Sequence, residues 1–295
     1  MDTENNNDGI YNLIEKEVNS TDKIYKPDFS QKTGRELLAF YLQTKFKQAL
    51  SYDKKAEKSV IVHIKDDFIS RFTKRLINNP QRRILIGITG ESASGKSTIC
   101  NEISSFINKF NQPVAIVRTD NYFNDISELI KKYGSFDALR DNGYDIDSPQ
   151  NFQLDILRKD LESIAEGNDI KIPRYLLNGT GISIPNSMLI KSDKIIIVEG
   201  VATMFEAIQD VYDIKLYVET DENIRKDRFL SRAEKRNQDP ENALKHWEYI
   251  QDAGRKYILP ARENMDIILN GDCNLPYFTQ ILEYLYTITN NFEQG

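Results

Sequence analysis

Residues 90–98 read Gly-Glu-Ser-Ala-Ser-Gly-Lys-Ser-Thr and fit the pattern G-x-x-x-x-G-K-[ST]. In this pattern, backbone amides at the start of a helix surround the phosphates of a nucleoside triphosphate. Lys96 is expected to bridge the β- and γ-phosphates and so to act in catalysis, and the Ser97 hydroxyl is expected to hold Mg²⁺. We predict nucleotide contacts along the whole loop, from Gly90, Glu91, Ser92, Ala93, Ser94, Gly95, Lys96, Ser97 and Thr98.

Two acidic residues, Asp120 and Glu199, come directly after apolar runs. A carboxylate near the γ-phosphate can accept a proton from an attacking hydroxyl or orient Mg²⁺, so Asp120 is a candidate base and a candidate metal ligand. Its alternative role is to cap the helix that follows. Glu199 is expected to organise magnesium, and the alternative is a charged residue where a strand leaves the core.

A cationic cluster follows later in the chain, at Arg225, Arg228, Arg232, Lys235 and Arg236. Phosphoryl transfer needs positive charge over the transferring group, and a basic helix supplies it. Acidic residues are interleaved with the cluster, which is also typical of a solvated helix face. We expect one or two of these arginines to be functional.

The elements around these residues alternate between strand and helix patterns. Strands are expected at residues 83–89, 112–118, 194–200, 211–218 and 266–269, and helices at 96–110, 151–165, 222–235, 241–257 and 276–286. Such alternation predicts an α/β fold, with a parallel sheet flanked by helices on both faces. Ligands of these folds bind beyond the carboxyl ends of the strands, where Asp120 and Glu199 fall.

The first 80 residues differ from the rest, so we divide the chain into an N-terminal extension (1–80) and a nucleotide-binding domain (81–295). Residues 1–9 are polar and rich in Asn, which favours disorder. Residues 32–50 and 66–77 place apolar side chains on one helical face each. We expect these two helices to pack against the domain. A membrane or partner helix is the alternative.

Composition excludes several classes of protein. The net charge of −6 argues against general nucleic-acid binding. The sequence has no apolar run long enough to span a bilayer, so no membrane role and a cytoplasmic location are expected. Cys100 falls in the helix after the phosphate loop, which favours a buried thiol over a disulfide with Cys273.

Taken in order, six segments resemble the uridine kinase and phosphoribulokinase family. They are the phosphate loop, Thr-Asp-Asn-Tyr-Phe at 119–123, Tyr-Asp-Ile-Asp-Ser-Pro at 144–149, Lys-Ile-Pro-Arg-Tyr at 171–175, Ile-Val-Glu-Gly at 197–200 and Thr-Asp-Glu-Asn-Ile-Arg at 220–225. The resemblance runs from about residue 83 to 271. It implies a five-stranded parallel sheet with a helical lid, and transfer of phosphate from Mg·ATP to a hydroxyl of a small acceptor.

The resemblance also implies roles for particular residues. Asp120 matches the family's base, with Tyr122 beside it, and Asp147 matches an acidic residue near the acceptor and metal. Tyr175 matches a tyrosine that contacts the acceptor. Arg225 and Arg228 match the two arginines that open the lid helix and hold acceptor and phosphates.

The chain departs from the uridine kinases after Tyr175, where it reads Leu-Leu-Asn-Gly-Thr-Gly-Ile-Ser and lacks their Ser/Thr-His-x-Arg segment. The two glycines favour a tight hairpin instead. Residues 124–144 form an insertion, with Gly134 and Gly143 as candidate hinges, that we expect to cover the acceptor. A nucleoside is the leading acceptor, and a sugar phosphate or another small alcohol is the alternative.

A regulatory GTPase and a non-catalytic nucleotide-binding protein fit the sequence less well than a kinase. A regulatory GTPase needs an Asn-Lys-x-Asp motif, and the nearest string, residues 108–111, lacks the aspartate. A non-catalytic nucleotide-binding protein is the weaker alternative, because Lys96, Ser97, Asp120 and Glu199 are all present. The expected partners are therefore ATP and a small-molecule acceptor, and a homo-oligomer is open.

Overall fold

A central sheet with strand order β1-β8-β7-β2-β6-β3 organises the described part of the chain. The computed structural model describes residues 59–79, 81–109, 113–176, 178–273, 275, 278 and 279. Strands β2, β3, β6, β7 and β8 run parallel, and β1 pairs antiparallel with β8. Their bounds are β1 Ile61–Ile64, β2 Ile84–Thr89, β3 Val114–Arg118, β6 Ile195–Glu199, β7 Ile214–Glu219 and β8 Ile267–Asn270.

The predicted α/β fold and all five predicted strands are confirmed. Strand β2 lies between β6 and β7, and its residues from 85 to 89 are buried, as its apolar sequence requires. Strand β1 was not predicted, so the sheet has one more strand than expected. This edge strand and the helix that follows it precede residue 80 and still pack on the sheet.

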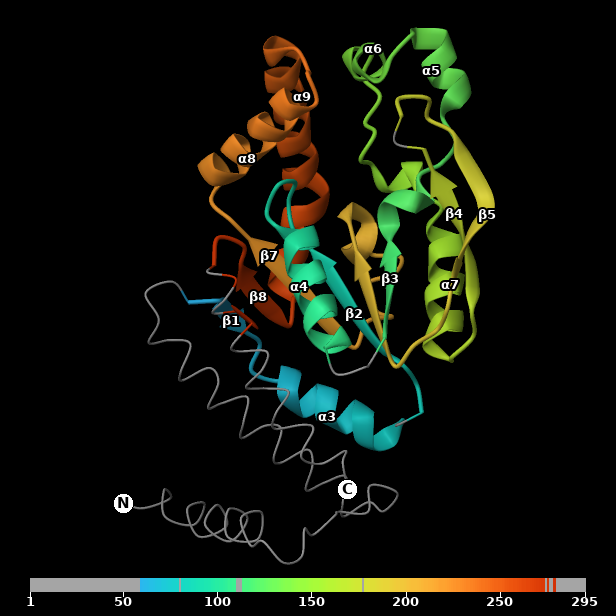
Figure 1. Cartoon of the computed structure of the whole chain (residues 1–295), viewed down its shortest axis with the longest axis vertical. Coiled ribbons are helices and arrows are strands. Elements are labelled where there is room, and N and C mark those ends of the chain that lie inside the picture. The colour runs from blue at the N-terminus through green and yellow to red at the C-terminus, as the bar shows by residue number, and fades with distance from the viewer. Residues whose placement is uncertain are drawn as a thin grey trace, which may run out of the picture.

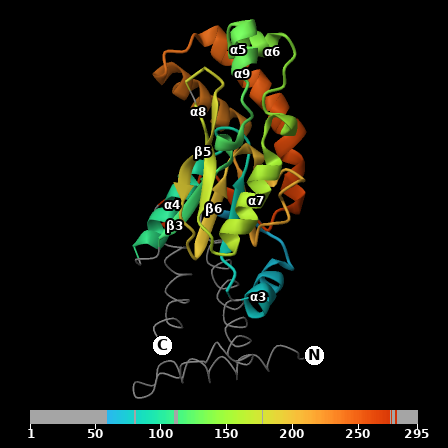
Figure 2. The same cartoon turned by 90° about the vertical axis from the view of Figure 1, so that its right-hand side faces the viewer.

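Helices cover both faces of the sheet (Figures 1 and 2). On one face, helix α4 (Lys96–Asn108) packs through Ile99, Cys100 and Ile103, and α3 (Phe68–Asn78) packs through Phe68. On the other face, α7 (Leu154–Ala165) buries Leu157, Leu161 and Ile164. The predicted helix at 66–77 and the buried Cys100 thiol are thus confirmed. The helix predicted at 32–50 and most of that at 276–286 lie outside the described residues.

A two-stranded hairpin, β4 (Ile170–Tyr175) and β5 (Ser183–Ile190), stands beside the main sheet. The predicted tight turn joins them, and its glycines Gly179 and Gly181 have φ of 84° and 70°. A side chain at position 181 would collide with Ile126, so the turn is packed against the insertion. The insertion itself contains α5 (Ser127–Tyr133) and α6 (Phe136–Asp141).

Helices α8 (Glu222–Lys235) and α9 (Pro240–Ala253) project above the carboxyl ends of the strands (Figure 1). The helix predicted at 241–257 changes type within its span, because residues Gly254–Ile258 form a π-helical turn, which a 3₁₀ helix at Leu259–Asn264 follows. Helix α6 lies beside α9 in both views (Figures 1 and 2). Arg140 contacts His246 at 3.1 Å, and the Tyr249 hydroxyl donates to Asp141 at 3.0 Å.

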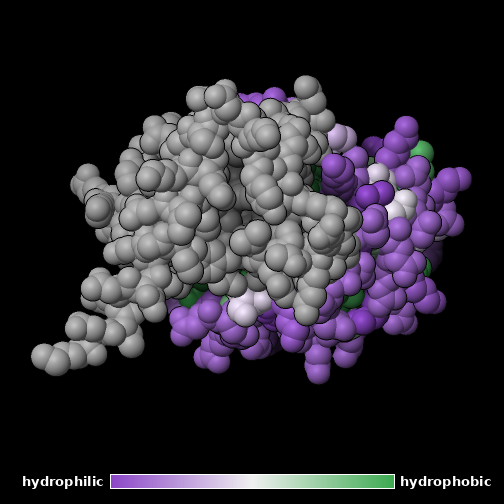
Figure 3. All heavy atoms as spheres, turned by 90° about the horizontal axis from the view of Figure 1, so that it is seen from below, coloured by the Kyte–Doolittle hydropathy of each residue, from purple (hydrophilic) through white to green (hydrophobic). Residues whose placement is uncertain are grey.

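Seen from below, the described surface is mainly hydrophilic with scattered hydrophobic residues (Figure 3). Among the residues that the structure describes, none of the helices combines the length and apolar character that crossing a membrane requires.

Candidate functional site

A cavity of about 780 Å³ lies at the carboxyl ends of β3 and β6, between the phosphate loop and α8. Polar and charged side chains line it from four parts of the chain. They are Lys96 and Ser97 from the loop, Asp120 and Glu199 from the strand ends, Arg228, Arg232 and Lys235 from α8, and the segment that begins at Gly271. The structure therefore brings most of the predicted phosphate and metal residues together.

The phosphate loop turns sharply between β2 and α4. Gly90 and Gly95 have φ of 147° and 105°, which glycine adopts without strain. A side chain at position 90 would collide with the Val218 carbonyl, and one at position 95 would lie 3.3 Å from the Gly271 carbonyl. The close approach of these backbones leaves room for nothing larger than glycine. The amides at the start of α4 face the cavity, as an anion site requires.

Lys96 lies at the first position of α4, and its Nζ donates to the carbonyl oxygens of Gly90 at 2.8 Å and Glu91 at 3.0 Å. Burial lowers the pKa of Lys96, while Asp120 and Glu199 act in the opposite direction. The amine is thus held inside its own loop, close to two carboxylates that oppose the effect of burial on its pKa.

Ser97, in the first turn of α4, contacts Glu199 at the end of β6. The Ser97 hydroxyl donates to Glu199 Oε2 at 3.0 Å, and Arg118 Nε donates to Glu199 Oε1 at 3.2 Å. Glu199 is the last residue of β6 and is buried. Its carboxylate is therefore oriented by a hydroxyl and a cation on two separate elements.

Asp120 follows β3 in a short 3₁₀ helix at Thr119–Tyr122. Its Oδ1 is buried and has no hydrogen-bond partner among the described residues. Burial raises the pKa of Asp120, Lys96 opposes that rise, and Glu199 adds to it. A side chain at position 200 would collide with the Thr119 hydroxyl and lie 3.0 Å from Oδ1, so the backbone packs closely beside the carboxylate. Asp120 is one of the residues that line the cavity, and a buried carboxyl with a raised pKa at such a place suits a general base.

The α8 arginines are divided between two environments. Arg228, Arg232 and Lys235 line the cavity, and Arg228 also donates to the Gly271 carbonyl and to Asp272, both at 3.1 Å. Arg225 was predicted to act on acceptor and phosphates, but it does not line the cavity. Its side chain is 4% exposed and forms an ion pair with Glu91 at 3.1 Å. Contacts within the protein thus occupy this guanidinium, and its role toward acceptor and phosphates stays a prediction.

Asp147 lies in the loop before α7, and Tyr175 is the last residue of β4. Burial and the Asp145 and Asp120 carboxylates raise the pKa of Asp147 to about 6, against the effect of Arg140. Tyr175 is buried, with its ring centroid 5.2 Å from that of Phe123. Neither Asp147 nor Tyr175 lines the cavity, although the charges of Asp120 and Lys96 act on the pKa of Asp147.

Tyr122, expected beside Asp120 as an acceptor contact, has a side chain that is completely buried in the core, and its role toward the acceptor stays a prediction. Its hydroxyl donates to Asp160 of α7 at 2.8 Å. The 3₁₀ turn that directs Asp120 into the cavity directs Tyr122 away from it, so Tyr122 supports the turn.

Sequence reasoning missed the loop after β8. A side chain at Gly271 would collide with the Ser94 carbonyl and the Thr220 hydroxyl, and Thr220 donates to Ser94 O at 2.8 Å. A glycine directly after a predicted strand was the available signal, because such glycines mark a close backbone approach. Arg118, which orients Glu199, was also missed. It is half-exposed at the end of β3, where its sequence gives no sign of a partner.

Comparison with known proteins identifies the family. The profile of the phosphoribulokinase / uridine kinase family matches residues 85–273. The chain belongs to this family. It is 27% identical over 205 residues to uridine-cytidine kinase B of Dictyostelium discoideum, with 68% of this chain and 80% of the relative covered. It is 34% identical over 145 residues to a uridine kinase of Clostridium novyi, with 49% of this chain and 65% of the relative covered.

Another relative, uridine-cytidine kinase A of Dictyostelium discoideum, is 27% identical, and the match covers 67% of this chain and 37% of that protein. Among solved structures, phosphoribulokinase from Rhodobacter spheroides superposes with a TM-score of 0.47 at 15% identity, covering 64% of this chain and 70% of that one. These relatives are kinases of nucleosides or sugars. The protein is accordingly a nucleotide-binding phosphotransferase of the P-loop kinase type.

Proposed function

We propose that the protein transfers the γ-phosphate of Mg·ATP to a hydroxyl of a small uncharged acceptor, with a pyrimidine nucleoside such as uridine as the leading candidate. The loop at residues 90–98 and the cations of α8 support the binding of the ATP phosphates. Arg232 and Lys235 line the cavity and have no carboxylate partner among the described residues. They supply positive charge where the transferring phosphate would lie.

Asp120 supports the transfer step. A hydroxyl that attacks the γ-phosphorus must lose its proton, and Asp120 Oδ1 is the buried oxygen in the cavity without a partner in the described structure. Its raised pKa makes the carboxylate a better proton acceptor than an exposed aspartate. Lys96 lies close enough to stabilise the charged form before the proton moves.

The donor set fits magnesium. The Ser97 hydroxyl and the Glu199 carboxylate are hard oxygen ligands, and Mg²⁺ keeps most of its remaining positions for water and phosphate. Bound there with ATP, Mg²⁺ would neutralise phosphate charge. Glu199 and Ser97 would hold it, and Arg118 keeps the Glu199 carboxylate turned toward Ser97.

The carboxylates around Asp147 favour an uncharged acceptor. Asp120, Asp147 and Asp145 lie together there, and their mutual repulsion contributes to the raised pKa of Asp147. Among the described residues, Arg140 pairs with Asp137 and Lys256 pairs with Asp145, while Lys96 is held by carbonyl oxygens of the phosphate loop. A phosphorylated sugar would meet these carboxylates without a free cation, whereas a neutral hydroxyl compound would donate hydrogen bonds to them.

A screen for ADP release tests this proposal. Purified protein with Mg·ATP is offered uridine, cytidine, glycerol and ribulose 5-phosphate, and the product is identified by mass. Lys96→Ala, which removes the phosphate-bridging amine, is measured in parallel to subtract contaminating kinases. We expect turnover of a nucleoside and little of ribulose 5-phosphate. Turnover of ribulose 5-phosphate alone would overturn the uncharged acceptor, and wild-type turnover by Lys96→Ala would overturn the nucleotide site.

A further inference from the structure

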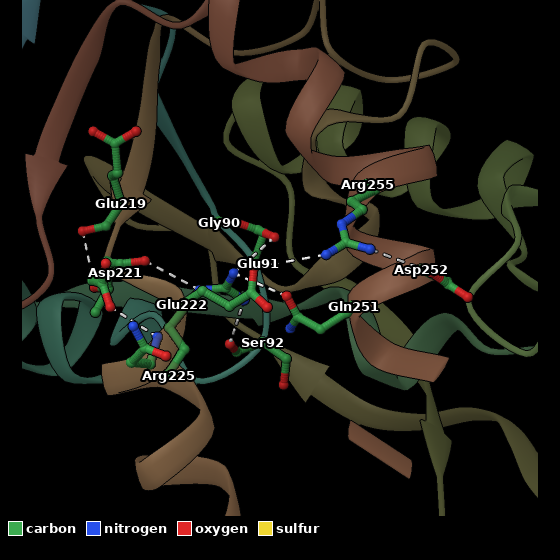
Figure 4. Close-up of polar contacts among 12 residues, drawn as sticks. Gly90, Glu91, Ser92, Glu219, Asp221, Glu222, Arg225, Gln251, Asp252 and Arg255 are labelled. Carbon is green, nitrogen blue, oxygen red and sulfur yellow. Dashed lines mark hydrogen bonds and ion pairs between the residues drawn. The ribbon is translucent and has the colours of Figure 1, made fainter. Parts of the chain in front are cut away.

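Glu91 lies inside the phosphate loop, but its side chain turns away from the cavity toward α8 and α9 (Figure 4). Its Oε1 forms an ion pair with Arg225 Nη2 at 3.1 Å, and the two side chains are 15% and 4% exposed. A side chain at Gly254, in the π-helical turn after α9, would lie 3.2 Å from the same oxygen. The carboxylate is therefore enclosed between the loop and the end of α9.

Arg225 is saturated by contacts within the protein. Nε donates to the Thr220 carbonyl at 3.1 Å, Nη2 to Gln251 Oε1 at 3.1 Å, and Nη1 to the Ser92 carbonyl at 3.5 Å. Its guanidinium also lies 5.6 Å from the ring centroid of Trp247 on α9. Together with Glu91, these groups give the Arg225 guanidinium four acceptors and the face of one aromatic ring as contacts.

Arg225 connects three parts of the chain. Glu91 and Ser92 belong to the phosphate loop, Arg225 to the first turn of α8, and Gln251 to the last turn of α9. Fixing the first turn of α8 also fixes the direction of the rest of the helix. Arg228 and Arg232 follow Arg225 at helical spacing and are the residues that reach the cavity.

We propose that Glu91 is a positioning residue, which acts through Arg225 to hold α8 and α9 against the phosphate loop and so places Arg228 and Arg232 over the cavity. The role of those two arginines rests on the proposed function. The contact between the phosphate loop and the two helices does not depend on the proposed function, and it can be measured without substrate.

Trp247 provides the measurement, because it is the single tryptophan of the chain and is 4% exposed between α8 and α9. Acrylamide quenching of its fluorescence is compared in wild type, Glu91→Gln and Glu222→Gln. Glu222 is a matched control, since it pairs with Arg255 at 3.7 Å across the same helices with both side chains more than half exposed. Circular dichroism checks that each variant is folded.

We expect Glu91→Gln to raise the quenching constant at least two-fold and to weaken Mg·ATP binding at least five-fold, with Glu222→Gln close to wild type in both. In an Arg225→Met background, Glu91→Gln should have no further effect on either quantity. If Glu91→Gln fails to fold, Gln251→Ala, which removes a neutral partner of Arg225, takes its place in the same comparison.

Two results would overturn the proposal. One is a quenching constant of the folded variant equal to that of Glu222→Gln. The other is an undiminished effect of Glu91→Gln in the Arg225→Met background, which would mean that Glu91 acts on the nucleotide without Arg225. The quenching comparison needs no nucleotide, so it decides the role of Glu91 even where the wild type phosphorylates none of the acceptors in the screen.

Discussion

The Ser97 hydroxyl and the Glu199 carboxylate, 102 residues apart in the sequence, are joined by a 3.0 Å hydrogen bond. This contact connects the first turn of α4 to the last residue of β6. The two groups that are proposed to hold magnesium are thus already adjacent in the protein alone. Their arrangement depends on the packing of α4 against the sheet.

We predict that Ser97→Ala and Glu199→Gln each raise the Mg²⁺ concentration for half-maximal activity about ten-fold, since each removes one proposed oxygen ligand or its charge, worth about 1.4 kcal/mol. ADP release is followed at fixed ATP while Mg²⁺ is varied. Ser105→Ala, on the exposed side of the same helix, is the control and should leave the requirement unchanged. An unaltered Mg²⁺ requirement in both variants would exclude these ligands.

Asp120→Asn should reduce kcat about 10²- to 10⁴-fold, because the amide keeps the shape of the side chain and cannot accept the proton. ATP affinity, measured by calorimetry, should change less than three-fold. The raised pKa of Asp120 comes mainly from burial, which the neutral amide tolerates, so the variant should stay folded. Equal losses of kcat and ATP affinity would instead identify Asp120 as a metal ligand or structural residue.

Asp147 should make acceptor binding depend on pH. Its pKa is raised to about 6 by burial and neighbouring carboxylates, so the carboxyl becomes protonated as the pH falls through that value. The acceptor KM should then rise, because the neutral group accepts hydrogen bonds less strongly. Asp147→Asn should remove the inflection near pH 6 while leaving ATP affinity intact. An inflection that persists in the variant would belong to another group.

The same pKa has a consequence for stability. Because the pKa rises on folding, the folded protein binds the proton more tightly than the unfolded chain, and the free energy of unfolding falls as the pH rises through about 6. Urea unfolding of wild type and Asp147→Asn at pH 5 and pH 8 measures this effect. The variant should lose less stability between the two pH values than the wild type does.

Removing the Asp213 carboxylate should destabilise the protein more than removing the Asp210 carboxylate. It is buried at the start of β7, where it accepts from Arg82 at 2.8 Å and from the Leu85 amide at 2.9 Å, and Arg75 lies 2.7 Å away. Asp213→Ala should lower the free energy of unfolding by about 3 kcal/mol, since two arginines lose their partner. Asp210→Ala breaks an exposed pair with Arg158 and should cost about 1 kcal/mol or less. Similar losses at both positions would contradict this ranking.

The residues that could be placed from the sequence are those set by local order. The phosphate loop and Asp120 come just after β2 and β3, Glu199 ends β6, and parallel strands bring their carboxyl ends to one edge. Arg225 and Tyr122 could not be placed in this way. Their orientation depends on Gln251 and Asp160, distant residues that no spacing rule connects with them.

The unpredicted parts of the fold have a similar cause. Strand β1 has only four residues, and its pairing with β8 joins chain segments some 200 residues apart. In the hairpin, β5 is mostly exposed and β4 does not alternate strictly between buried and exposed residues, so their periodicity is weak, although the two glycines indicated the turn between them. Both pairings are decided by tertiary contacts, which a single sequence does not display.

Helix α9 contacts both Arg225, beside the phosphate loop, and helix α6 of the insertion. Through Gln251 it reaches the arginine beside the phosphate loop, and through His246 and Tyr249 it reaches α6 of the insertion next to the acceptor side. A ligand that shifts α9 from either side therefore changes the free energy of binding on the other. Linkage of this kind is reciprocal, so ATP must alter acceptor affinity by the same factor as the acceptor alters that of ATP.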